Sequence, residues 1–455
     1  MRSLTQWEKI MKFMPEKQNC LIKQIEIMAF AVLIVFSLAS ASWATTYFVD
    51  KNHSGSSDAN SGKEDSPWRT IQKGANEAKA GDTVYVKDGI YYEWVDVKNS
   101  GVSGKPIIFK AFPGDQPVID GSGVNVPDWY ALFHSSGNDY ITLDGFEVRN
   151  SGECLIRLRH GNGLVIRNCV AHGNSDVRRS GIVIDHCNRG LVENNEAYDT
   201  GWNALTAEST SNVTFQYNYV HDNPEHNGIN IFPKTSEEQT HYEGNDIKNN
   251  IVFKCTNGIY TRYQVNNVIS NNLIFENLAN GIILEADQAQ PHNFKSYTEI
   301  YNNTIADNEG NGIQSSNASY LTVKNNIISG NGPYSVYIAG SVATGHDINH
   351  NLYYPSPRFG WSGNTLSSLS SWQDISSQGA NSFVGDPVFE DRAGDNYELT
   401  AESLHAIDEG VDLSSENVST DLVGTRRPMG NTFDLGAYEF VTETLPAPKN
   451  LRIIE

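Results

Sequence analysis

The 455-residue sequence predicts an all-β protein, a single right-handed parallel β-helix with a helical cap at its N-terminal end and a loop-rich cap at its C-terminal end. Three observations predict this fold. Short apolar strands and Asn-containing turns recur roughly every 22 to 32 residues, Gly and Tyr are frequent while Met is rare, and the repeated region lacks helical periodicity. Strands this short cannot bury a face alone, whereas stacked coils bury one continuous column of side chains.

Each repeat carries an Asn in its turn and a third strand such as GIVIDH or GIILEA. Asn tolerates left-handed φ, and stacked Asn side chains can hydrogen-bond along a solenoid. The expected ladder consists of Asn168, Asn195, Asn218, Asn250, Asn272, Asn303, Asn326 and Asn351. Because side chains alternate along a strand, the expected inward stack consists of Ile182, Ala204, Ile229, Ile259, Ile282 and Ile313. A β-propeller or sandwich would instead show hairpin turns about every 8 to 12 residues, and the sequence has none of these.

The parts of the chain follow in order. Residues 1–44 read as a signal peptide, with an apolar run and small residues after a basic stretch, although an uncleaved anchor is the alternative. Residues 45–105 are expected to form an N-terminal cap and the first strands, and the short helix of the cap places Ile71, Ala75 and Ala78 on one face. The remaining parts are the β-helix core at 106–355, a C-terminal coil and cap at 356–441, and a linker stub at 442–455.

Charge and cysteine use narrow the class of protein. The chain has 33 Lys and Arg against 54 Asp and Glu, a net charge of −21, which argues against general nucleic-acid binding. A polyanionic substrate would need local cations or a bound metal. We expect a secreted, periplasmic or cell-surface monomer with no membrane span after cleavage. Two disulfides are possible among the four later cysteines, but their apolar contexts favour buried free thiols at Cys154, Cys169, Cys187 and Cys255.

The two ends of the mature chain resemble known sequences. The stretches YFVDKN, SPWRTIQKGANEAKAGDTVYVKDGIYYE and KPIIFKAFPGDQPVIDGSG resemble secreted bacterial β-helix proteins that are pectate-lyase-like, nearest the family-nine polysaccharide lyases. The tail, with DPVF and DLGAYEF, resembles a C-terminal module attached to such proteins. This resemblance implies export and action on a polysaccharide.

Family-nine lyases use Ca²⁺ and a Lys base, and the sequence departs from both motifs. Asn174, Ser175, Asp176 and Asp185 match parts of the calcium motif, but Val177-Arg178-Arg179 interrupts it. The Asn-Gly-Phe-Lys element that carries the family's base is absent. Signatures of polygalacturonase-type hydrolases and of alginate epimerases are absent as well.

The outward ends of the third strands suggest where chemistry could occur. One residue per coil gives a column, since neighbouring coils lie about 4.8 Å apart. The column consists of Asp185, Glu208, Lys234, Arg262 and Glu285. Insertions after Gly228 and Gly281 leave the same strand edge, which is typical of loops that wall a binding surface.

Three functions remain open. In the leading hypothesis, a metal-assisted lyase cleaves a uronic-acid polysaccharide by β-elimination: Asp185, Glu208 and Asp176 hold Ca²⁺, Lys234 is the base, and Arg262 neutralises the uronate. The expected substrate-binding residues are Arg157, His186, Asn230, Tyr260, Tyr263 and Glu285. Alternatively, Asp185 and Glu208 act as the pair of a retaining glycoside hydrolase, or the face binds glycans without catalysis.

Overall fold

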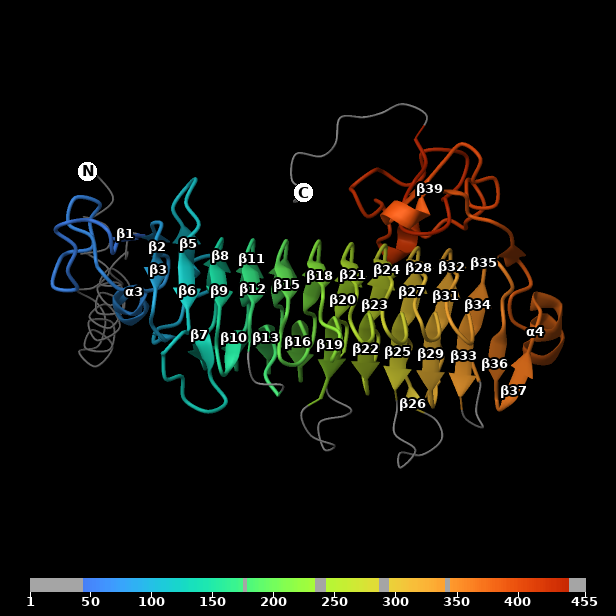
Figure 1. The fold of residues 1–455 in the computed structure, drawn as a ribbon, viewed down its shortest axis with the longest axis horizontal. Helices are drawn as coiled ribbons and strands as arrows, with labels where there is room; N and C mark the ends of the chain where they lie inside the picture. The colour runs from blue at the N-terminus through green and yellow to red at the C-terminus, as the bar shows by residue number, and fades with distance from the viewer. Residues whose placement is uncertain (1–43, 175–177, 234–242, 286–293, 340–343, 442–455) are drawn as a thin grey trace, which may run out of the picture. The chain divides into compact units, whose positions relative to one another are not determined.

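The computed structural model describes residues 44–174, 178–233, 243–285, 294–339 and 344–441, and within them it confirms a parallel β-helix. The predicted signal peptide and linker stub lie outside these residues. Each coil contributes one strand to each of three twelve-stranded sheets, numbered 1 to 3 in chain order (Figure 1). No helix in the described ranges is long and apolar enough to cross a membrane.

Sheet 1 begins next to the N-terminal cap and its strands pair in parallel throughout. Its strands are β1 (Thr46–Val49), β2 (Thr83–Val86), β5 (Ile107–Ala111), β8 (Ile141–Asp144), β11 (Val165–Arg167), β14 (Leu191–Glu193), β17 (Thr214–Gln216), β20 (Asp246–Lys248), β23 (Val268–Ser270), β27 (Glu299–Tyr301), β31 (Thr322–Lys324) and β34 (Asp347–Asn349).

The C-terminal module contacts sheet 2, and it also packs on Tyr301 and Val268 of sheet 1. The strands of sheet 2 are β3 (Ile90–Tyr91), β6 (Val118–Asp120), β9 (Glu147–Arg149), β12 (Val170–His172), β15 (Glu196–Tyr198), β18 (Tyr219–His221), β21 (Ile251–Phe253), β24 (Leu273–Phe275), β28 (Thr304–Ala306), β32 (Ile327–Ser329), β35 (Leu352–Tyr354) and β38 (Phe383–Val384).

Sheet 3 contains the third strands of the repeat. Its strands are β4 (Val95–Val97), β7 (Ala131–Ser136), β10 (Cys154–Arg159), β13 (Ile182–Asp185), β16 (Leu205–Glu208), β19 (Ile229–Phe232), β22 (Ile259–Arg262), β25 (Ile282–Glu285), β29 (Ile313–Ser316), β33 (Val336–Ala339), β36 (Phe359–Trp361) and β37 (Asn364–Leu366). Only the last pair, β36 with β37, is antiparallel among the strands of this sheet that the structure describes. Two smaller pairs join β26 (Phe294–Lys295) to β30 (Ala318–Ser319) and β39 (Phe389–Asp391) to β40 (Asn396–Leu399).

The inward stack of sheet 3 follows the predicted alternation with one correction. Ile182 is in register with Leu205, and Leu205 is in register with Ile229. Ala204 was predicted to lie in this stack, but the strand begins one residue later, at Leu205; Ala204 is nevertheless buried. Ile229, Ile259, Ile282 and Ile313 then continue the column as predicted.

A buried Asn ladder runs from Asn195 to Asn351 as expected. Each side-chain amide donates to the side-chain oxygen of the next Asn, as from Asn272 to Asn303 at 2.9 Å, and the next oxygen also accepts the backbone N–H. Asn168 does not belong to this ladder. It has φ of 53°, and the ladder place in its coil is held by Cys169, whose N–H donates to Asn195. Left-handed backbone and ladder bonding thus fall on adjacent residues of the turn.

Both ends of the solenoid are closed. The predicted N-terminal helix is α3 (Ile71–Glu77), capped by the Thr70 hydroxyl, and Ile71, Ala75 and Ala78 are buried. At the other end an unpredicted helix, α4 (Leu369–Ser376), places Trp372 against Phe359, with ring centroids 4.7 Å apart.

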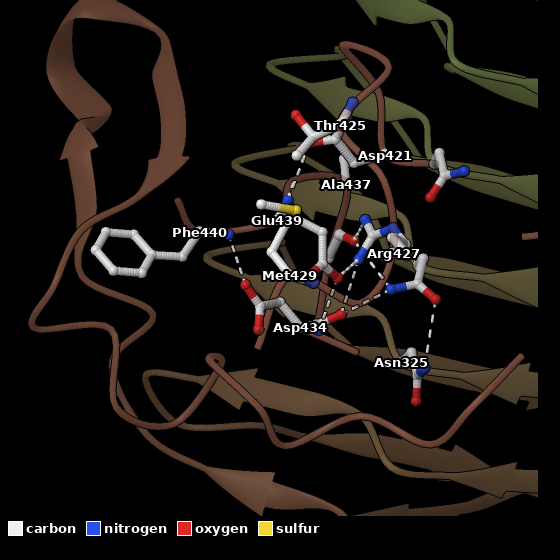
Figure 2. A network of polar contacts seen from close by, with 12 residues as sticks. Asn325, Asp421, Thr425, Arg427, Met429, Asp434, Ala437, Glu439 and Phe440 are labelled. Carbon is white, nitrogen blue, oxygen red and sulfur yellow. Dashed lines mark hydrogen bonds and ion pairs between the residues drawn. The ribbon is translucent and has the colours of Figure 1, made fainter. Parts of the chain in front are cut away.

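The C-terminal module, residues 386–441, packs its apolar side chains on Phe253, Leu273 and Phe275 of sheet 2. It also contains the short 3₁₀ turns η2 (Arg392–Gly394) and η3 (Ser414–Glu416). A buried pair holds the module together: the Arg427 guanidinium lies 2.7 Å from the Glu439 carboxylate, and both side chains have no exposed surface (Figure 2). The DLGAYEF motif that the sequence analysis singled out therefore builds this buried centre.

All four cysteines of the described chain are free and buried, which confirms the preference for thiols over disulfides. Burial raises the pKa of Cys154 to about 11 and that of Cys169, Cys187 and Cys255 to about 12. Thiols of this kind remain protonated and unreactive at neutral pH.

Candidate functional site

The outward column on sheet 3 is partly as predicted. Asp185 is in register with Glu208, and Arg262 is in register with Glu285. The coil between these pairs presents Phe232 beside Glu208, so the placement of Lys234 on that rung was wrong. The error arose because strand β19 ends at Phe232, two residues before Lys234. Lys234 and Asp176 lie outside the described residues.

Arg157 links the two neighbouring carboxylates. This Arg projects outward from β10, and its Nη2 contacts a carboxylate oxygen of Asp185 and, at 3.0 Å, one of Glu208. Its Nε donates to the same Asp185 oxygen at 3.1 Å. Because Asp185 and Glu208 contact the same nitrogen, these two oxygens are at most two hydrogen-bond lengths apart, about 6 Å. We call Arg157, Arg159, Asp185, His186 and Glu208 the arginine–carboxylate cluster.

Asp185 lies at the centre of this cluster with no exposed surface. Burial opposes its ionisation, but the hydrogen bond from His186 and the charge of Arg157 hold the pKa of the carboxyl well below its usual range. Arg159 adds a further cation, with its Nε 3.4 Å from Asp185. The carboxylate therefore stays charged at neutral pH, accepts hydrogen bonds from Arg157 and His186, and forms an ion pair with Arg159.

The expected calcium ligands do not fit a calcium site in this arrangement. The Arg157 guanidinium contacts both Asp185 and Glu208. The carboxylate oxygens that would bind Ca²⁺ are therefore already paired with a positive charge, which would also repel the ion. Within the described ranges, no group of three or more His, Cys, Asp or Glu side chains is arranged to hold a metal.

Arg262 lies three coils after Asp185 and has a hydrogen-bond donor without a partner among the described residues. Its Nε is buried and has no hydrogen-bond partner in the described part of the chain. The guanidinium lies over the ring of Tyr263, 5.0 Å from its centroid. Tyr263 itself is only 3% exposed, so this residue supports Arg262 and does not offer a surface to a substrate.

The other predicted binding residues lie on the same outward face. Asn230 is in register with Tyr260, and the buried Oδ1 of Asn230 has no hydrogen-bond partner among the described residues. The hydroxyl of Tyr260 donates to Glu285. A buried polar atom without a partner costs stability, so it is a reasonable contact point for a ligand.

Several residues at the N-terminal end of this face were not predicted from the sequence. His134 precedes Arg157 in register, and its Nδ1 lies 3.0 Å from Asp96. Burial lowers the pKa of His134, so its ring is neutral at neutral pH. Arg159 could have been found, since a residue two positions after Arg157 shares its face. Trp129, on the loop before β7, gave no repeat signal at all.

The comparisons with known proteins agree with this architecture. Residues 47–203 match the Pel9A-like right-handed β-helix region, and residues 238–352 match the general right-handed β-helix region. The Pel9A-like match is confined to this N-terminal part of the chain. That region ends just before β16 and so includes Arg157 and Asp185 but not Glu208.

Two curated relatives match short segments. The chain is 31% identical to "Pectate lyase PEL9" of Emericella nidulans over 97 residues, which are 21% of this chain and 23% of that protein. It is 43% identical to "Uncharacterized protein YwoF" of Bacillus subtilis over 68 residues, 15% of this chain and 14% of that one. The chain thus spans less than a quarter of either relative.

Two solved structures superpose on most of this chain. XylC in complex with xylose superposes with a TM-score of 0.58 over 87% of this chain and 98% of XylC, at 14% identity. Pectate lyase Pel9A superposes with a TM-score of 0.58 over 88% of this chain and 97% of Pel9A, at 19% identity. At these identities the likeness shows a shared fold.

Proposed function

We propose that the protein is an exported enzyme that binds a polysaccharide along the outward face of sheet 3 and cleaves it at the arginine–carboxylate cluster. The supporting observation is the contact of one guanidinium with carboxylates from two neighbouring coils. Polar groups continue from β10 to β25, six rungs that span about 24 Å. A face of this length suits several consecutive sugar rings better than a single one.

The first candidate reaction is β-elimination on a uronic-acid polymer. The Pel9A-like region and the similarity to a pectate lyase support this class. In a chain of net charge −21, Arg159 and Arg262 are the local cations that an acidic polymer requires. A guanidinium paired with the uronate carboxylate would stabilise the charge that develops as a base removes the C5 proton. Lys234, which lies outside the described residues, stays the predicted base.

Hydrolysis is the second candidate, because of the proximity of Asp185 and Glu208. Retaining glycosidases hold their two carboxyl groups about 5–5.5 Å apart, with one ionised and the other acting as the acid. The lowered pKa of Asp185 suits the ionised nucleophile. Since Asp185 has no exposed surface, a sugar reaches it only after Arg157, Arg159 or His186 rotates away.

The reaction is identified by its product. Mature protein is incubated with pectate, alginate, a glycosaminoglycan and xylan, with and without a chelator. Elimination forms an unsaturated sugar that absorbs in the ultraviolet, whereas hydrolysis forms reducing ends without that absorbance. We expect cleavage of an acidic polymer with ultraviolet absorbance. Because the cluster does not fit calcium, chelation should leave the rate unchanged, and a rate that requires added Ca²⁺ would restore the metal-assisted mechanism.

Matched variants locate the site. Glu208→Gln weakens the pairing with Arg157 in either reaction and removes the acid–base group of hydrolysis, so it should lower kcat/KM about 100-fold or more. Glu193→Gln, an outward carboxylate on sheet 1 that bonds Gln216, should leave the rate unchanged. If no polymer is cut but one is retained on an affinity gel, the protein is a glycan-binding module and the enzymatic proposal fails.

A further inference from the structure

Trp129 combines a high exposure with a rigid attachment. It lies on the loop between β6 and β7, and 64% of its surface is accessible. The guanidinium of Arg179 covers one face of the indole, 4.1 Å from the ring. A large apolar side chain that stays in water needs an explanation when the groups that hold it are themselves buried.

The backbone of Trp129 is fixed by charged groups on both sides. Its N–H donates to the Glu153 carboxylate at 3.0 Å, and its carbonyl accepts from Nη1 of Arg157 at 3.4 Å. Glu153 also forms an ion pair with Arg179, with 2.5 Å between Oε2 and Nε. Both of these charged residues are more than nine-tenths buried.

The buried ion pair and the left-handed backbone are each unfavourable in free energy. Together they hold the Trp129 indole in a fixed position. Burying an ion pair carries a desolvation penalty, and Trp129 adopts a left-handed φ of 68°, which is unfavourable for a bulky residue. A loop packed only for stability would turn the indole inward. Here the loop presents one ring face outward while Arg179 supports the other.

We propose that Trp129 is a sugar-stacking subsite, whose open face binds a pyranose ring of the polysaccharide next to the arginine–carboxylate cluster. The apolar face of a pyranose ring stacks on an indole in the way that apolar and aromatic groups pack. Arg157 connects the two places, since Nη1 binds the Trp129 carbonyl while Nη2 binds Asp185 and Glu208. This inference rests on the proposed function for the identity of its ligand.

The experiment compares Trp129→Ala and Trp129→Phe with Tyr219→Ala, a matched control because Tyr219 is 43% exposed on sheet 2. Retention on affinity gels is measured for each in the inactive Glu208→Gln background, and KM and kcat are measured in the active protein. We expect Trp129→Ala to weaken retention and raise KM about 5- to 10-fold with little change in kcat, Trp129→Phe to restore part of the binding, and Tyr219→Ala to have no effect.

The outcomes separate the two proposals. If polymer is cleaved but Trp129→Ala changes neither KM nor retention, the subsite is wrong while the proposed function stands. If wild-type protein cleaves nothing but its retention depends on Trp129, the subsite stands and the catalytic proposal fails. A Trp129→Ala variant with an unchanged melting temperature shows that lost binding reflects the missing indole. If Trp129→Phe binds as poorly as Trp129→Ala despite normal melting, simple ring stacking is overturned.

Discussion

Sheets 2 and 3 are built on the same repeated core but present different outward faces. On sheet 2, His172, Tyr198 and His221 stack in successive coils with centroids about 5 Å apart, and Phe253 and Phe275 continue the stack. Tyr397 of the C-terminal module then covers its apolar end. On sheet 3 the corresponding outward positions carry Arg, Asp and Glu, and polar groups such as that of Asn230 lack partners.

This difference separates folding from function in one molecule. The inward residues of both sheets are mostly aliphatic side chains that build one continuous core. The outward residues of sheet 2 are used to attach the module, while those of sheet 3 hold charges that burial and pairing keep in place. The predictions below test whether the module and sheet 3 are independent, in order of decreasing expected effect.

The largest effect is expected at the buried centre of the module. Arg427→Met leaves the Glu439 carboxylate buried without its cation, which costs about 3–5 kcal/mol. If the two faces are independent, hydrogen exchange accelerates in residues 386–441 while the amides of β10 to β25 stay protected. The double variant Arg427→Met/Glu439→Leu removes both charges and should recover much of the loss. Equal loss of protection in sheet 3 would contradict the separation.

The Asn ladder beneath both faces should give the next largest effect. Asn272 donates to Ile247 at 2.8 Å and to Asn303, and it accepts from the backbone of Asn250. Asn272→Ala leaves buried groups unpaired, at about 1–3 kcal/mol each, so we expect a loss of roughly 2–4 kcal/mol in urea unfolding.

The control for the ladder is Asn162→Ala, on an exposed turn. Asn162 bonds only Asp139 through its side chain in the described structure, so its loss should stay below about 1 kcal/mol. Similar costs at the two positions would show that the ladder is not a special source of stability. A loss at Asn272 that also abolishes activity would show that sheet 3 depends on the whole core.

The fold was more predictable than the site, for a physical reason. Repeated turns and strands specify one pattern many times, so a single error such as Ala204 for Leu205 does not change the architecture. The site depends on outward residues that occur once. Counting along the strands placed Asp185 beside Glu208 correctly but put Lys234 where Phe232 lies, because strand length varies from coil to coil.

Contacts between side chains far apart in the sequence could not be predicted. Nothing in the sequence near Trp129 indicates that Arg179, fifty residues later, would support its ring. Arg157 was predicted to bind substrate, yet its role as a link between two carboxylates depends on rotamers that no spacing encodes. Helix α4 was not predicted within the C-terminal coil and cap; it is short and rich in Ser, and Trp372 anchors it against the end of the core.

The pH dependence of stability should differ in sign between the module and sheet 3. Burial raises the pKa of Asp434 to about 6 from an ordinary value of 3.8. The folded module therefore keeps a proton that the unfolded chain loses, and stability falls by on the order of 3 kcal/mol as pH rises from about 4 to about 6. For Asp185 the pKa is lowered, so its contribution is present above about pH 4 and is lost as pH falls further.

Asp434→Asn and Asp185→Asn separate these contributions. Unfolding of each variant is measured by urea between pH 3 and pH 7. Asp434→Asn should flatten the decline between about pH 4 and pH 6, and Asp185→Asn should flatten the loss on the acid side. If Asp434→Asn keeps the wild-type slope, another buried carboxyl, such as Asp421, whose pKa burial also raises, is responsible.

The smallest effect is expected at a partly exposed ion pair between the module and the solenoid. Arg392 pairs with Asp307, and the two side chains are 32% and 28% exposed. Exposed pairs are worth less than about 1 kcal/mol and are weakened by salt. Arg392→Ala should therefore lower the stability of the module slightly at low salt and not at all at high salt. Tyr397→Phe, which removes only the hydroxyl that bonds Asp307 at 3.0 Å, is the control that keeps the apolar contact. A loss at Arg392 as large as that at Arg427 would mean that the module is held to sheet 2 by charge, and the contrast between an apolar covered face and a charged open face would no longer hold.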